Sequence, residues 1–141
     1  MTISFFEPGD VPQPPDNVKI ERLDALPHPD GWRVKIELHV TPFQQRPNFE
    51  VILLRRDEDG TDSQIANLSI VETMHPKMEF TMHIRGVDDP NGDYLLRAIL
   101  YYREHAEEGA EEPPPVEIKD QREIMFSIPH QVEETEESKD A

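Results

Sequence analysis

The chain has 141 residues, of which 30 are Asp or Glu and 14 are Lys or Arg, so its formal net charge at pH 7 is −16. That length suits one domain, and the absence of cysteine excludes disulfide bonds, thiolate metal sites and a cysteine nucleophile. The charge argues against nucleic acid and against an anionic membrane as partners, because both would repel the chain. No apolar run is long enough to span a bilayer, and MTISFFEPGD lacks the basic and long apolar parts of a secretory signal. We therefore expect a cytoplasmic protein of bacterial type.

Proline dominates the start of the chain. Pro8, Pro12, Pro14 and Pro15 all fall within the first 16 residues, where they disfavour both helix and strand. We predict a proline-rich N-terminal arm over residues 1–16, followed by one domain over residues 17–129. Further prolines lie between the apolar segments of this domain and cut it into pieces of strand length.

Alternation of apolar and polar residues identifies the first two strands. Val18–Leu23 is short, whereas Trp32–Val40 alternates throughout. A period of two predicts a strand with one buried face, since a helix would scatter the same apolar side chains around its circumference.

A hairpin and three further strands follow. The segments Asn48–Arg56 and Gln64–Val71 flank the turn sequence DEDGTD at residues 57–62. Lys77–Arg85 alternates again, Asp93–Arg103 is long and apolar on both faces, and Glu123–Ile128 completes a set of seven strands.

Two acidic segments flank the last strand. Residues 104–141 contain 13 acidic and 3 basic residues, so they carry −10 of the total charge of −16. Such segments bury too little apolar area to offset the entropy lost on ordering. We predict a flexible acidic and proline-rich connection over residues 104–120 and a disordered acidic tail over residues 130–141. Either segment would aid solubility or attract a basic partner.

The residues that open the sixth strand carry a further signal. Gly92-x-Tyr94-x-Leu96-x-Ala98 resembles the same position in immunoglobulin-like and fibronectin type III-like domains. In those domains the tyrosine makes a structural corner, where its hydroxyl bonds to backbone of the preceding turn. The resemblance concerns the class of sandwich and implies no particular chemistry.

Seven strands without a convincing helix indicate an all-β, seven-stranded antiparallel immunoglobulin-like sandwich. In that arrangement the first, second and fifth strands form one sheet, and the fourth, third, sixth and seventh strands form the other. The predicted core consists of the inward-facing residues Val18, Ile20, Trp32, Val34, Ile36, Leu38, Phe49, Val51, Leu53, Phe80, Met82, Tyr94, Leu96, Ala98, Leu100 and Phe126.

No catalytic constellation is found in the sequence. The serines lie outside Gly-x-Ser-x-Gly, no phosphate loop or glycine-rich nucleotide fingerprint is present, and the histidines lack the close spacings of metal sites. His39 and His83 are predicted to face outward at opposite ends of one sheet. We therefore expect that the protein is not an enzyme.

Acidic turns suggest an alternative function. The turns after the first, third and fifth strands should meet at one pole, and they contain the candidate ligands Asp57, Asp59, Asp62, Asp88 and Asp89. Calcium prefers such oxygen ligands, so a calcium- or carbohydrate-binding accessory module is one hypothesis. The same residues are also ordinary turn formers, the EF-hand spacing is missing, and the pole lacks the exposed aromatic residues on which sugars stack.

The outward side of the second sheet is unexpectedly apolar. Ile52, Leu54, Leu95, Ile99 and Tyr101 should all point away from the core, and Met125 or Ile124 could join them. A solvated antiparallel sheet normally alternates, so we expect a cover. A partner protein or a second copy could provide it, the chain's own Ile3, Phe5 and Phe6 could fold back over it, or the face is uncovered. The leading hypothesis is a non-enzymatic protein–protein interaction module that uses this face to bind a partner protein or a second copy.

Overall fold

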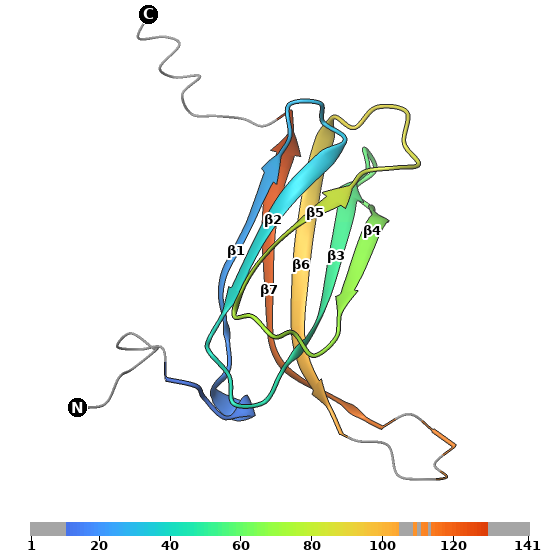
Figure 1. The fold of residues 1–141 in the computed structure, drawn as a ribbon. Helices are drawn as coiled ribbons and strands as arrows, with labels where there is room; N and C mark the ends of the chain where they lie inside the picture. The colour runs from blue at the N-terminus through green and yellow to red at the C-terminus, as the bar shows by residue number, and fades with distance from the viewer. Residues whose placement is uncertain (1–10, 105–108, 110, 113, 130–141) are drawn as a thin grey trace, which may run out of the picture.

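Seven strands form two antiparallel sheets that pack face to face in the computed structural model, which describes residues 11–104, 109, 111–112 and 114–129 (Figure 1). A short 3-10 helix, η1 (Pro15–Asn17), precedes the strands. The strands are β1 (Ile20–Pro27), β2 (Arg33–Val40), β3 (Asn48–Arg56), β4 (Asp62–Ile70), β5 (Lys77–His83), β6 (Gly92–Arg103) and β7 (Val116–Ile128). The smaller sheet has the order β1-β2-β5 and the larger sheet has the order β4-β3-β6-β7. The predicted all-β sandwich and its strand order are confirmed.

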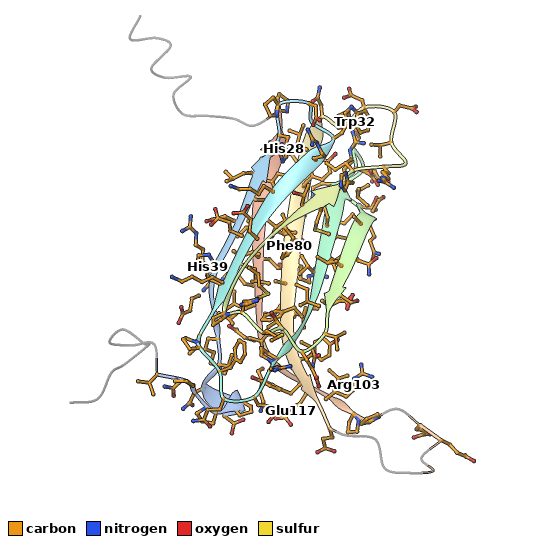
Figure 2. All side chains as sticks on the ribbon, in the orientation of Figure 1. His28, Trp32, His39, Phe80, Arg103 and Glu117 are labelled. Carbon is orange, nitrogen blue, oxygen red and sulfur yellow. The ribbon has the colours of Figure 1, made fainter. Side chains whose placement is uncertain are left out.

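The predicted alternation sets the register of the strands. In β2 the buried residues alternate with partly exposed or exposed ones, because one side of the strand faces the opposite sheet. Arg33 lies opposite His83 and His39 lies opposite Lys77 in the pairing of β2 with β5. The two histidines therefore lie at opposite ends of this pair, as predicted, and Figure 2 labels His39 on the outer side of β2.

The core fills the space between the sheets largely as predicted, with one clear error. Trp32 is 39% exposed and lies in the bend before β2, where its backbone N–H bonds to the Asp30 carboxylate at 2.9 Å. Its place in the alternating pattern is therefore misleading, because the pattern continues one residue beyond the strand. Phe80 and Phe126 pack against the core but stay partly exposed.

The last strand is longer than predicted. β7 begins at Val116 and pairs with β6 as far as Arg103, so residues 116–120 belong to the sheet and not to a flexible connection. A bulge between Leu100 and Tyr101 of the pairing leaves Lys119 as an extra residue. This extra residue breaks the alternation and hides the strand in the sequence. The predictions for residues 1–10 and 130–141 lie outside the described residues.

The loops gather at two poles of the sandwich. The β1–β2, β3–β4 and β5–β6 turns lie together at one end, as predicted, and the described ends of the other connections lie at the opposite end (Figure 1). His28 and Trp32 mark the first pole, whereas Arg103 and Glu117 mark the second (Figure 2).

A buried tyrosine fixes the turn that enters β6. The Tyr94 hydroxyl donates a hydrogen bond to the carbonyl oxygen of Pro90 at 2.5 Å, which is the bond that the sequence predicts. Burial raises the pKa of Tyr94, so its hydroxyl keeps the proton that it donates. Arg55 donates to the Asn91 carbonyl at 2.7 Å and lies 6.0 Å from the centre of the Tyr94 ring. Gly92 is required beside it, because its φ is +150° and an added Cβ would lie 3.2 Å from Arg55.

Tyr94→Phe should lower the free energy of unfolding by about 1–2 kcal/mol, because it removes a buried hydrogen bond without changing the packed ring. Urea denaturation followed by circular dichroism measures this change. Tyr101→Phe is the matched control, since its ring faces outward from the same strand, and it should stay within about 0.5 kcal/mol of the natural protein. Equal losses in the two variants would contradict a special structural function of Tyr94.

Candidate interaction surface

The candidate surface is the outer face of the larger sheet, meaning the side of β4-β3-β6-β7 that is turned away from β1-β2-β5. Four of the five residues predicted for this face lie between two buried neighbours on β3 or β6, Leu54 follows the buried Leu53, and each of the five is itself only partly buried. They are Ile52, Leu54, Leu95, Ile99 and Tyr101. The register thus brings them to one face, but it divides them into two groups.

The first group lies toward the pole of the three turns. Leu54, Leu95 and Met125 lie side by side across β3, β6 and β7, and Ile52 is the next outward residue on β3. Met125 is 59% exposed, so this row ends in an unshielded apolar side chain. We refer to Ile52, Leu54, Leu95 and Met125 as the upper cluster.

The second group lies toward the opposite pole. Tyr101 lies opposite Ile118, and Arg103 lies opposite Val116 in the pairing of β6 with β7. Ile118 is 58% exposed and Val116 is 45% exposed. The Arg103 guanidinium lies 6.0 Å from the centre of the Tyr101 ring. We refer to Ile99, Tyr101, Val116 and Ile118 as the lower cluster.

A shallow hollow of about 440 Å³ adjoins the lower cluster. Its lining combines aromatic, aliphatic and charged side chains from β6, the start of β3 and the neighbouring loops: Asn48, Val71, Glu72, Tyr101, Arg103, Glu104 and Pro114. The hollow extends the lower cluster into a concave surface that a protruding side chain of another protein could fill.

Polar pairs separate the two clusters. The Arg97 guanidinium bonds to the Glu123 carboxylate at 2.5 Å, and the hydroxyl of Ser69 bonds to Glu50 at 2.7 Å. These pairs cross the middle of the face, because Arg97 lies beside Ile52 and Glu50 lies beside Ile99. The face is therefore not one continuous apolar patch, as the sequence suggested, but two clusters with charged groups between them.

Two residues of the lower cluster were missed in the sequence. Val116 and Ile118 fall in the segment predicted to be a loop, although they are spaced two residues apart, as outward residues of a strand are. Of the eight large hydrophobic side chains that are exposed among the described residues, β7 supplies three. The two-residue spacing of these apolar side chains is the pattern that could have predicted this part of β7, but the charged residues around them made the segment resemble a loop.

The acidic pole places its carboxylates within turns. Ser63 donates to Asp57 at 2.6 Å, Thr61 donates to Asp59 at 2.6 Å, and the backbone N–H of Asn91 donates to Asp89 at 3.0 Å. The hydroxyl of Thr61 lowers the pKa of Asp59. Asp62 pairs with Arg56, whereas Asp88 is exposed. In the described part of the chain, no group of three or more His, Cys, Asp or Glu residues could hold a metal ion, so the calcium hypothesis gains no support.

A network of ion pairs around Lys119 lies at the opposite pole. The Lys119 ammonium bonds to Asp16 at 2.5 Å and also to Glu117, so it joins η1 to β7 across 103 positions of sequence. Both carboxylates raise the pKa of Lys119. Beside it, Tyr102 donates to the Gln45 carbonyl at 2.9 Å at the edge of a pocket of about 270 Å³. Burial raises the pKa of Tyr102 to about 12.

The chain matches no protein-family model, and a search of curated proteins finds no match. Among the described residues, no helix has the length and hydrophobicity needed to cross a bilayer.

Tyr102 predicts a loss of stability in strong alkali. An unfolded tyrosine ionises near pH 10, whereas Tyr102 in the folded protein has a pKa of about 12. The folded state therefore holds the proton more tightly, and stability that is complete below pH 10 falls as the pH rises toward 12. Tyr102→Phe should make the free energy of unfolding depend less steeply on pH in this range, measured by urea denaturation at several pH values. An unchanged slope would contradict the prediction, and Tyr101→Phe serves as the control.

Proposed function

We propose that this protein is a non-enzymatic protein–protein interaction module that binds a partner protein through the outer face of its larger sheet. The single observation that supports the proposal most is the pair of apolar clusters on that face, which end in the exposed side chains of Val116, Ile118 and Met125. Monomeric proteins rarely leave such side chains together without a use for them.

The arrangement matches the usual anatomy of an interface. Apolar and aromatic side chains supply most of the binding energy, while charged groups at the margins fix the orientation of the partner. Here Tyr101 and Arg103 lie together beside a hollow, and Tyr and Arg are among the residue types that dominate such contacts. The Arg97–Glu123 pair between the clusters would then select a partner with matching polar groups.

The class of fold is part of the proposal. We assign the sandwich to the immunoglobulin-like or fibronectin type III-like class, and the bond between Tyr94 and Pro90 and the order of strands in both sheets support this assignment. Many sandwich domains of these classes act by contact with other proteins and carry out no chemistry. The sequence supports the same conclusion, because it contains no recognisable catalytic motif.

Leu54→Asp and Met125→Asp should each abolish partner capture while the fold is kept. Each substitution puts a charge into the upper cluster, where a bound partner would have to desolvate it. Quantitative mass spectrometry of proteins captured from the source cell by the tagged full chain measures the effect. Proteins retained by the natural chain should be lost with both variants, whose folding is checked by circular dichroism.

Thr81→Asp is the matched control, because Thr81 is exposed on the outward side of the smaller sheet. It adds the same charge and should leave the captured set unchanged. A captured set that is the same for all three variants as for the natural chain would overturn the use of the outer face.

A further inference from the structure

Within the part of the chain that the structure describes, four strands have one unpaired edge each: β1 and β5 in the smaller sheet, and β4 and β7 in the larger sheet. An unpaired edge exposes backbone N–H and C=O groups and can pair with another chain, so natural edges usually carry charges or proline. Three of the four follow this rule. Their protecting residues are Glu21, Arg22, Asp24 and Pro27 on β1, Lys77 and Glu79 on β5, and Glu117, Lys119, Asp120, Arg122 and Glu123 on β7.

The edge of β4 is the exception. From Ser63 to Val71 the sequence SQIANLSIV contains no charged residue and no proline, although 31% of the whole chain is charged. A bulge at Ile65 interrupts the pairing of β4 with β3 near its start, but the register is regular from Ala66 to Ile70. This last part is therefore a regular, uncharged edge.

The sandwich is also open along this side. Eleven partly buried hydrophobic residues pack against the core in the described chain, and six of them lie on β4 and β5: Ile65, Ala66, Leu68, Ile70, Met78 and Phe80. A groove of about 430 Å³ between the two strands has an apolar half, formed by Leu68, Ile70, Met78 and Phe80, and a polar half, formed by Thr73, His75, Lys77 and Glu79. Figure 2 labels Phe80 on β5, the strand that forms one wall of this groove. A strand added to β4 would direct its inward side chains over the groove.

We propose that β4 pairs antiparallel with β4 of a second copy of this chain, which gives a two-fold dimer with one continuous sheet. The register that centres on Leu68 is self-complementary. It puts Leu68 opposite the same residue of the second copy, Ala66 opposite Ile70 on the inward side, and Asn67 opposite Ser69 on the outward side. A small residue thus meets a large one, and an amide meets a hydroxyl to which it can bond.

Charge selects a second copy as the occupant. Two chains of net charge −16 repel each other, so the contact that costs least is one that brings few unpaired carboxylates together. Around Asn67 and Ser69 the nearest carboxylate is Glu50, and both side chains already bond to it, at 3.3 Å and 2.7 Å. The inward residues of the edge are all apolar. The groove beside the edge adds one charge of each sign, Lys77 and Glu79, and Glu79 already lies 3.8 Å from the Lys35 ammonium. The edge therefore presents no excess charge of either sign to a second copy.

The dimer is independent of the proposed binding of a partner. Pairing at the edge uses the free backbone N–H and C=O groups of β4 and covers the groove. It leaves the upper and lower clusters of both copies exposed on the same face of one extended sheet. A failure of the dimer would therefore leave the outer-face proposal intact, and the reverse also holds.

The test is a charge exchange at the paired edge. Light scattering during size-exclusion chromatography of the natural full chain should give twice the chain mass of 16.4 kDa. The double variant Asn67→Asp with Ser69→Asp should give the mass of one chain, because two pairs of carboxylates then face each other. Mixing it with the variant Asn67→Lys with Ser69→Lys should restore a mass of two chains, since every facing pair then has opposite charges.

Two controls separate a direct contact from general charge effects. Thr81→Asp with His83→Asp adds the same two carboxylates to the edge of β5 and should leave the dimer intact, and so should Leu54→Asp on the outer face. A natural chain that is a monomer at all concentrations, a dimer that survives the double Asp substitution, or a mixture that stays monomeric would each overturn the proposal.

Discussion

An open sandwich has strand edges that its own sheets leave unpaired, and this constraint explains much of where charge lies in the protein. Along the β1–β7 side the edge is closed by polar groups: the backbone N–H of Ile20 donates to Asp120 at 2.8 Å, and Lys119 joins Asp16. Along the β4–β5 side no such polar closure joins the described strands: β5 carries Lys77 and Glu79, the end of β4 is uncharged, and a groove remains between the two strands. The same fold thus closes one side with its own polar groups and leaves the other side open, where we propose that a second copy adds a strand.

The outer face poses the related problem of side chains without a cover. Exposed ion pairs such as Arg97–Glu123 contribute about 0.2–1 kcal/mol, and a partner that covers the middle of the face must offer polar groups that satisfy them. Complete burial of a large apolar side chain contributes about 1.5–3 kcal/mol. Met125, Ile118 and Val116 are 59%, 58% and 45% exposed, so a cover would add only part of that amount for each of them. The proposed partner would therefore gain mainly from the two clusters, and it would need polar groups that pair with the charges between them.

Most of the fold could be predicted from the sequence. A strand that buries one face alternates apolar and polar residues, and this alternation is uninterrupted in β2 and β5. The order of strands was predicted from their number and from the motif around Tyr94. The hydrogen bond of Tyr94 joins residues only four positions apart, so a short sequence motif is enough to predict it. The first half of β7 could not be predicted, because a bulge at Lys119 reverses the alternation and the residues around it are charged. Trp32 was misplaced for the opposite reason, since the pattern extends past the end of the strand. The division of the outer face into two clusters could not be predicted. It depends on which residues of neighbouring strands lie opposite each other, and the sequence of one strand does not contain that information.

The distribution of charge joins these features. Much of the excess negative charge lies in residues 104–141, and at physiological ionic strength its field decays over about 8 Å. Repulsion between two copies is therefore decided locally, by the groups that come within that distance of each other. On β4 from Ala66 to Ile70 no side chain is charged, and the nearby Glu50 already accepts two hydrogen bonds. The proposed dimer therefore uses the one described edge that lacks charge, while the acidic segments of the chain oppose other, less specific contacts.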